Sequence, residues 1–320
     1  MQQPGNAVFT LLMILAMCAW GGSWVSAKLI TSSEIPEVLI FWRFLFTTLS
    51  SFPLVFVLSR SWRLNARSWL QAFGGAALIV AYNMMFFRGL QTGFAGAGGV
   101  LVTTMNPILT VLLAAFFFRR KLGWKEIGGL ILGFTGGAIL LRGWSLNPTS
   151  LWNSGNAFFL VASFSWALLT IVSEKSRPHA SPLVFSFYVY ALATLLDLFQ
   201  VSPRQLWGAL QHDYAFWLNI LYLSCFATTF ATTVYFFASG RLGSGKASSF
   251  IFLVPFSAVG LSWLILKETP RMHTIIGGML AISAVYLINS KREVATRLAP
   301  GEAAAVAVGA DREDHTLASH

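Results

Sequence analysis

Ten apolar runs separated by short polar spacers constrain this chain more than any other feature. Most are about 18–24 residues long, enough for a helix to cross roughly 30 Å of hydrocarbon. Transmembrane β-strands would alternate apolar and polar residues, and these runs do not alternate. The sequence therefore predicts an all-α polytopic membrane protein with ten transmembrane helices. The runs span 7–29, 37–58, 69–90, 95–118, 124–141, 155–173, 182–199, 214–237, 246–266 and 273–289.

The composition agrees with this interpretation, because 56% of the 320 residues are hydrophobic and only 11% are charged. A soluble domain carries about 25% charged residues, which cover its surface. The net charge of +10 could indicate nucleic-acid binding. No stretch, however, is long and polar enough to form a basic face on a folded domain. We expect the lipid bilayer and a small molecule as partners, and no nucleic acid.

The distribution of Lys and Arg predicts the orientation. With the N-terminus inside, 14 of them fall in cytoplasmic segments and 6 on the far side. Positive residues favour the cytoplasmic side, so both termini are expected there. Residues 295–320 are rich in Ala, Gly and charges, which is typical of a disordered cytoplasmic tail.

The two halves of the chain resemble each other. Ala19-Trp20 matches Ser165-Trp166 at an offset of 146 residues, and Pro107 matches Pro255 at 148. Five helices per unit is an odd number, so the second unit enters the membrane from the opposite side. The sequence thus predicts two inverted five-helix repeats, over 1–145 and 146–294. Chance similarity among apolar helices is the alternative.

Polar and aromatic residues at helical spacing predict a central cavity between the halves. The candidate lining consists of Trp20, Ser23, Trp24, Tyr82, Asn83, Thr103, Asn106, Ser163, Trp166, Thr229 and Phe252. The competing interpretation is that the polar residues only bond neighbouring helices and that the aromatic residues face lipid. Such a lining would provide stacking faces and neutral dipoles without a fixed charge. It would suit zwitterionic or uncharged solutes with an apolar part.

Two prolines and one arginine stand out inside the apolar runs. Pro107 and Pro255 occupy equivalent positions, and interrupted helices in both halves indicate a transport site, so both are candidate bending points. A static packing kink is the alternative. Arg43 is expected to be a structural charge that snorkels toward the outer interface or pairs with a carbonyl near the first helix. Asp197 is expected to be interfacial.

Enzyme signatures are missing from the sequence. The five histidines fall in loops, helix ends or the tail, and no helix carries two ligands at metal spacing. We therefore expect no catalytic residue, no metal and no cofactor. An intramembrane enzyme acting on lipid-linked substrates is the alternative from another class, and it would need clustered acid/base side chains near one interface.

Two groups of residues carry a family resemblance. Residues 19–24 (AWGGSW) followed by 42–44 (WRF) resemble the opening of EamA-type carriers of the drug/metabolite transporter superfamily. Pro255, then Leu266-Lys267-Glu268 and Ile276-Gly277-Gly278, resemble the family's ending. The first half departs from the pattern, with Arg119-Arg120-Lys121 where a glutamate is expected. The resemblance covers about residues 7–290.

The resemblance implies a secondary transporter that works by alternating access at a cavity between the repeats, with the fifth and tenth helices apart from it. Similar members move amino acids and related metabolites, often outward, and other relatives carry sugar-type solutes or nucleosides. We expect an exporter of amino acids or similar compounds in the inner membrane. It would be a monomer or a weak homodimer.

Overall fold

The computed structural model describes residues 6–59, 61–117, 119, 121–142, 147–176, 180–242 and 250–287, and these residues form helices and no strand. The predicted tail over 295–320 lies outside them. The helices are α1 (Asn6–Ile30), α2 (Pro36–Leu58), α3 (Ala66–Thr92), α4 (Ala95–Phe117), α5 (Trp124–Leu140), α6 (Pro148–Asn153), α7 (Asn156–Ser176), α8 (Pro182–Leu198), α9 (Pro203–Ala209), α10 (Tyr214–Leu221), the π-helix η2 (Tyr222–Phe230), α11 (Ala231–Leu242), the 3-10 turn η3 (Phe250–Phe252), α13 (Leu253–Leu266) and a last helix over Met272–Leu287.

Local sequence signals explain where several helices begin. The side chains of Asn65, Ser181 and Asp213 accept hydrogen bonds from backbone N–H groups in the first turns of α3, α8 and α10. These caps satisfy donors that have no partner within the helix. Proline opens α2 and α8, where its missing N–H removes no helical hydrogen bond.

By length and composition, six helical stretches could cross a membrane: Val8–Ile30, Pro36–Leu58, Ala66–Thr92, Ala95–Phe117, Asn156–Ser176 and Tyr214–Tyr235. A seventh span is possible if α8 and α9 are counted together, although they are bent by 112° at their junction. The stretches Phe250–Leu266 and Met272–Leu287 are apolar but shorter. The all-helical class is confirmed, and the arrangement of ten spans as an inverted repeat stays a prediction.

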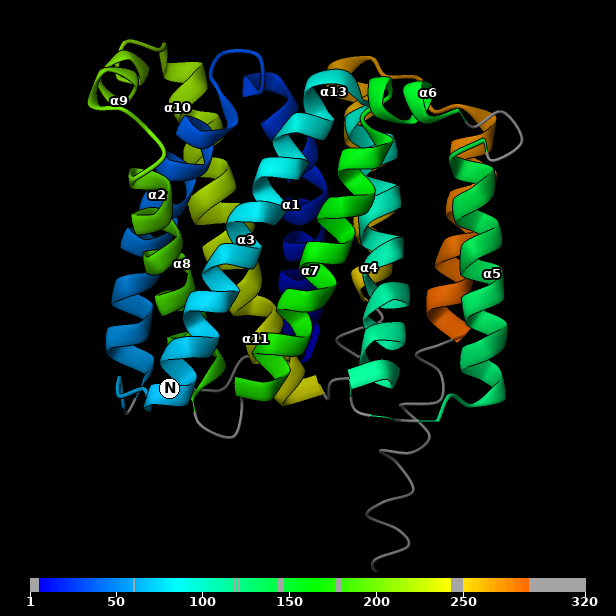
Figure 1. Ribbon diagram of the computed structural model, residues 1–320, viewed down its shortest axis with the longest axis horizontal. Coiled ribbons are helices and arrows are strands. Elements are labelled where there is room, and N and C mark those ends of the chain that lie inside the picture. The colour runs from blue at the N-terminus through cyan, green and yellow to red at the C-terminus, as the bar shows by residue number, and fades with distance from the viewer. Residues whose placement is uncertain are drawn as a thin grey trace, which may run out of the picture.

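The outside of the bundle is apolar, as a lipid-facing surface must be. Only 39–50% of the residues in the six spans are buried, and large apolar side chains such as Val57 and Phe116 are each 77% exposed. The most exposed tryptophans and one strongly exposed tyrosine lie at helix ends, with Trp124 at the start of α5 and Trp207 and Tyr214 at the opposite end of the bundle (Figure 1). Aromatic residues collect at the two membrane–water interfaces.

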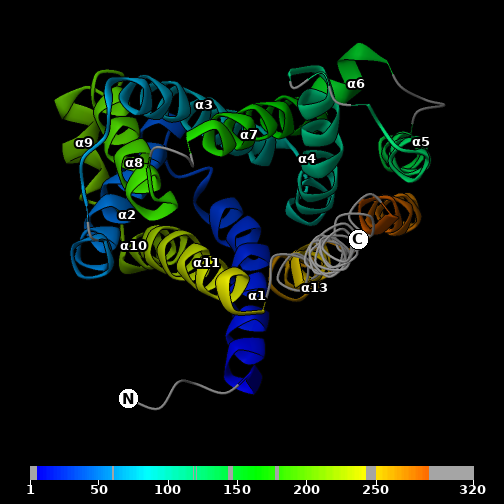
Figure 2. The ribbon, with the colours of Figure 1, turned by 90° about the horizontal axis from the view of Figure 1, so that it is seen from below.

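α5 and the last helix stand side by side at one edge of the bundle in both views, where both contact α4 (Figures 1 and 2). Glycines allow the two backbones to approach closely. A Cβ added at Gly136 would lie 2.7 Å from the carbonyl oxygen of Gly277, and one at Gly277 would lie 2.6 Å from that of Gly136. Small residues at such crossings are typical of membrane helices.

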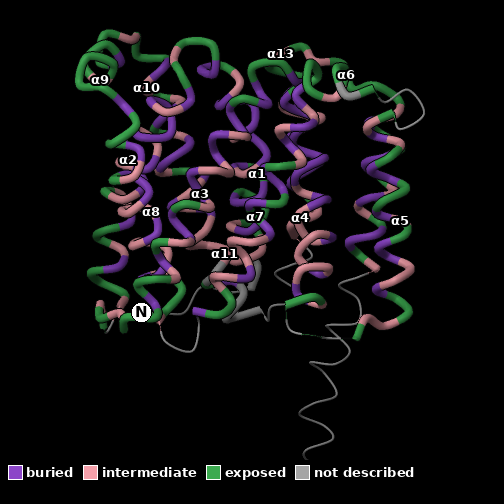
Figure 3. Tube along the Cα trace, in the orientation of Figure 1, coloured by how far each residue is buried: buried purple, intermediate pink, exposed green. Residues whose placement is uncertain are grey.

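The main core lies among α1, α2, α3, α4, α7 and α8, and includes Phe44, Phe87, Leu101, Phe159 and Phe185. Figure 3 shows buried positions recurring along α1, α3, α4 and α7. α3 packs on α7 and α8, α4 packs on α7 and α13, and α1 packs on α13 and α11. Nine of the eleven predicted lining residues lie on α1, α3, α4 and α7, which pack together here, whereas Thr229 lies on η2 and Phe252 on η3.

Candidate functional site

Arg43 of α2 is held inside the bundle by two neighbouring elements. Its Nη1 donates to Oδ1 of Asn83 on α3 at 2.8 Å, and its Nη2 donates to Oγ1 of Thr228 on η2 at 3.5 Å. The guanidinium also lies over the ring of Phe86, 5.7 Å from its centroid. This differs from the expected snorkelling or pairing with a carbonyl near the first helix, because polar partners on α3 and η2 are available at the same depth.

The π-helix η2 presents hydroxyl groups to α2. Ser224 donates to the carbonyl of Arg43 at 2.9 Å, and Thr229 shares a 2.7 Å hydrogen bond with Ser50. Thr228 donates to the carbonyl of Leu223, five residues earlier, at 2.7 Å. π-Helical turns are uncommon and frequently occur at functional sites. This one extends for nine residues and aligns three hydroxyls with the segment that carries Arg43.

Aromatic rings connect this polar group to three of the predicted lining residues. Phe86 contacts Trp24 at 4.8 Å and Tyr82 at 5.9 Å between ring centroids. Tyr82 in turn contacts Trp166 of α7 at 4.8 Å. We call Arg43, Tyr82, Asn83, Phe86 and Trp166 the central cluster, since hydrogen bonds or ring contacts join its members in sequence.

Trp166 of the central cluster and its neighbour Trp24 differ in exposure. Trp24 is only 3% exposed, because Phe86, Phe159 and the glycines Gly98 and Gly99 enclose it. Trp166 is 36% exposed. Trp24 thus packs as a core residue, whereas one part of Trp166 remains open. Trp166 contacts Tyr82 directly, whereas Trp24 is connected to Tyr82 through Phe86.

Other predicted residues lie further from the central cluster. Trp20 contacts Tyr235 of α11 at 5.6 Å, one helical turn from Trp24. Phe252 contacts Tyr286 of the last helix at 6.2 Å and is not joined to the cluster. Ser23, Thr103 and Ser163 each bond a carbonyl of their own helix. Oδ1 of Asn106 is buried without a hydrogen-bond partner.

The two prolines differ in their setting. Pro107 lies inside α4. Pro255 is the third residue of α13, directly after the 3-10 turn η3. A backbone N–H in the first turn of a helix has no helical partner, so a proline there removes no hydrogen bond. Of these two prolines, only Pro107 interrupts an established α-helix.

A polar clamp joins helices at the end of the bundle opposite the N-terminus. The carboxylate of Glu268 accepts hydrogen bonds from the backbone N–H groups of Ala95 and Gly96 at 3.2 Å each, and also from Ser262. Nζ of Lys28 donates to the carbonyls of Leu90 and Gly93. The carboxylate lies at the N-terminus of α4 and the ammonium at the C-terminus of α3, as the helix dipoles favour.

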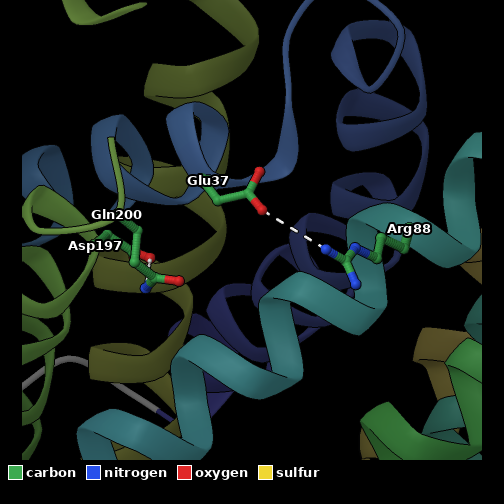
Figure 4. Close-up of polar contacts among 4 residues, drawn as sticks. All are labelled: Glu37, Arg88, Asp197 and Gln200. Atoms are coloured by element: carbon green, nitrogen blue, oxygen red, sulfur yellow. Dashed lines mark hydrogen bonds and ion pairs between the residues drawn. The ribbon is translucent and has the colours of Figure 1, made fainter. Parts of the chain in front are cut away.

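Asp197 lies near the end of α8, as the sequence indicated, and its side chain is fully buried there within the protein. Its Oδ1 accepts from Gln200 at 3.2 Å, and its Oδ2 is buried with no partner. Figure 4 shows this pair beside the ion pair of Glu37 and Arg88, whose closest atoms are 3.7 Å apart. The turn after α8 covers Asp197, which the apolar pattern of the helix alone does not reveal.

Sequence reasoning missed several residues of this region. From the sequence alone, Arg43 is interpreted as a structural charge, and Ser50, Phe86, Ser224 and Thr228 are not included in the lining. The isolated charge of Arg43 was the available signal, because ionisable residues at membrane depth are rare and usually face the bundle interior. Among the described residues, no group of three or more His, Cys, Asp or Glu could hold a metal ion.

An all-helical bundle with an apolar outer surface and a polar cluster held inside it defines a multi-pass membrane protein. The sequence profile of the EamA-like transporter family matches residues 8–142 and again residues 153–290. The chain belongs to this family. It is a transporter of the EamA type, which implies a small-molecule substrate.

The relatives are distant in sequence but similar over nearly their full length. An uncharacterized transporter of Archaeoglobus fulgidus is 25% identical, over 90% of this chain and 99% of the relative. A probable amino-acid metabolite efflux pump of Salmonella typhimurium is 27% identical, over 86% of this chain and 93% of the pump. A crystal structure with 18% identity matches 92% of this chain and 99% of its own, with a TM-score of 0.59, and this likeness concerns the fold.

Proposed function

We propose that this protein is a ten-helix secondary carrier that exports amino acids or related small metabolites by alternating access. Its two halves, 1–145 and 146–294, would form inverted five-helix repeats with the substrate site between them. The family membership supports a transporter, and the arrangement of helices around the central cluster supports this mechanism.

The pairing of helices is the observation that carries the proposal. If α1, α2, α3 and α4 correspond to α7, α8, η2–α11 and α13, then each contact has a counterpart in the other half. The contact between α3 and α7 corresponds to the contact between α11 and α1. The contact between α4 and α7 corresponds to the contact between α13 and α1. α3 packs on α8 as η2 packs on α2. The family profile also matches once in each half. Repeats of opposite topology commonly enclose the substrate site of secondary transporters.

The contacts between α4 and α13 suggest which end is closed. A Cβ at Gly99 would lie 2.6 Å from that of Ala258, and the N–H of Gly96 donates to Ser262 at 3.1 Å. These contacts, like the clamp around Glu268, involve the first half of α4 and the stretch from the middle of α13 to the residues that directly follow it. We infer that alternating access opens this far end by separating α1–α4 from α7–α13, with bending at Pro107 and Pro255.

The membrane placement follows from the same arrangement. The first helix begins, and the last described helix ends, on one end of the bundle (Figure 1). Together with the excess of Lys and Arg on that side, this supports cytoplasmic termini in a bacterial inner membrane. The glycines of α5 pack on Ile108 and on the last helix of the same chain, which favours a monomer, with a weak homodimer as the alternative.

Amino acids are favoured as substrates over nucleosides or sugar-type solutes. Two relatives are named probable amino-acid metabolite efflux pumps. The one from Salmonella typhimurium is 27% identical and the one from Escherichia coli is 25% identical, each over most of both chains. The central cluster combines aromatic faces with a few polar groups, which suits a small solute with one apolar part.

Exchange in proteoliposomes tests the proposal. Purified protein should exchange a labelled amino acid against an unlabelled one, and a flat response across amino acids, nucleosides and sugars would contradict it. We expect the flux to persist without a pH gradient, because the central cluster contains no carboxylate. Strict dependence on the gradient would contradict this uncoupled mechanism, and Asp197→Asn would then identify whether the buried carboxyl group is responsible.

A further inference from the structure

Arg43 carries a charge that no residue in the described part of the chain neutralises. Its guanidinium makes the two hydrogen bonds to Asn83 and Thr228, and no carboxylate lies within ion-pair distance. Its Nε is buried without any partner. A guanidinium has five N–H donors, so most of its capacity is unused.

The depth of Arg43 makes this unpaired charge costly. α2 begins at Pro36, and seven residues of helix place Arg43 about 10 Å along it. Charged residues at membrane depth are expensive unless they are paired or face water. The side chain of Arg43 does not snorkel along α2 toward the membrane interface, because its hydrogen bonds hold it against α3 and η2. An ionisable residue that is kept inside the membrane at this energetic cost marks a functional site.

Beyond its acceptors Asn83 and Thr228, the guanidinium of Arg43 lies near two tyrosines whose hydroxyls can donate hydrogen bonds. In the described residues, Tyr82 and Tyr190 are the titratable groups that interact electrostatically with Arg43. Neither phenolic hydroxyl forms a hydrogen bond with a residue in the described part of the chain. Tyr190 and Arg43 are separated by 147 residues, which lies between the repeat offsets of 146 and 148, so both halves contribute to one location. A cation flanked by free hydroxyls is complementary to an anion.

The aromatic part of the central cluster begins at the guanidinium of Arg43. Phe86 lies beneath the guanidinium, and Tyr82 and Trp166 extend the ring surface toward α7. An anion bound at Arg43 would therefore place an attached apolar group against Tyr82 and Trp166. A single arginine balances one negative charge, whereas a phosphate would require a second cation.

We propose that Arg43, assisted by the hydroxyls of Tyr82 and Tyr190, binds the carboxylate of the transported solute. The inference rests on the proposed function and narrows its substrate class to monocarboxylates with an apolar body. In the described residues, no carboxylate accompanies the cluster to hold an ammonium group. The amino group of an amino acid therefore contributes little to recognition.

Equilibrium binding to the purified protein tests this independently of transport. The probes are phenylalanine and leucine, their carboxamides, 3-phenylpropanoate and inorganic phosphate. We expect the three carboxylates to bind, with 3-phenylpropanoate close to phenylalanine, and both amides and phosphate to bind at least about tenfold more weakly. Equal binding of acids and amides, preferential binding of phosphate, or no binding of the acids would overturn the carboxylate site.

Substitutions then assign the site to Arg43. Arg43→Gln should weaken binding of the acids by about tenfold or more and leave the amides unchanged. Arg204→Gln, on exposed α9, is the matched control and should bind like the wild type. If Arg43→Gln does not fold, the Tyr82→Phe/Tyr190→Phe double variant keeps both rings and should show the same selective loss. Unchanged preference for acids in the folded variants overturns the inference.

The same proteins in liposomes separate the two hypotheses. Arg43-dependent binding of carboxylates without any exchange would refute the carrier while leaving the carboxylate site intact. Exchange of amino acids that survives in Arg43→Gln with the wild-type preference for acids would refute the carboxylate site while leaving the carrier intact.

Discussion

At the scale of single residues, Trp166 is the predicted lining residue with the clearest opportunity to touch a solute. It is 36% exposed and borders Tyr82 at 4.8 Å. Trp166→Ala should weaken transport while the protein remains folded and membrane-inserted, because the lost ring is not enclosed by the core. Trp20→Ala should have a similar effect. Transport kinetics and a thermal unfolding curve of each variant provide the two readouts, and normal kinetics in both variants would remove these residues from the cavity wall.

Trp24 offers the contrasting case. It is enclosed by Phe86, Phe159 and two glycines. Trp24→Ala should therefore destabilise the fold by about 3–5 kcal/mol, the usual cost of removing a buried aromatic side chain. Any loss of transport should follow the loss of folded protein. A stable Trp24→Ala protein with selectively altered substrate affinity would show that Trp24 touches the solute.

At the scale of helices, the two prolines should contribute unequally to motion. Pro107 interrupts α4, whereas Pro255 stands in the first turn of α13, where no hydrogen bond is lost. Pro107→Ala should change the transport rate more than Pro255→Ala, with stability altered by no more than about 1 kcal/mol. Initial rates of exchange measure the difference. Wild-type transport rates in both variants would show that the two prolines only form static packing kinks.

The clamp at Glu268 should hold the far end of the bundle closed. A charged acceptor at a helix N-terminus stabilises it by about 0.3–1 kcal/mol, and by up to about 2 kcal/mol when partly buried. Glu268→Gln should therefore speed hydrogen exchange at the first amides of α4, including those of Ala95 and Gly96. Glu174→Gln, on the exposed end of α7, is the control. Unchanged protection in Glu268→Gln would show that the clamp does not limit opening.

At the scale of the whole molecule, the apolar pattern predicted the helical ranges well, because in lipid the backbone must bond to itself. The first run was expected over 7–29 and α1 covers Asn6–Ile30; the fourth was expected over 95–118 and α4 covers Ala95–Phe117. Membership of the EamA-like family was also predicted from short motifs and is confirmed by the profile match.

The site was less predictable because it depends on how each helix is rotated about its axis. Trp20 and Trp24 lie on one face of α1, yet only Trp24 is enclosed. The direction of Arg43 depends on hydroxyls that the π-helix η2 turns toward α2, and the sequence from 222 to 230 carries no pattern that distinguishes a π-helix from an α-helix. The expectation of a lining without a fixed charge consequently omitted Arg43.

A single cysteine in the proposed cavity can show whether both ends open in turn. Ser23→Cys, in a protein whose native Cys18 and Cys225 are replaced by serine, places a thiol beside Trp20 and Trp24. Inside-out and right-side-out vesicles would be treated with a membrane-impermeant thiol reagent, with and without substrate. Alternating access at a central site predicts labelling from both sides and protection by substrate. Labelling from one side only, or from neither, would contradict it.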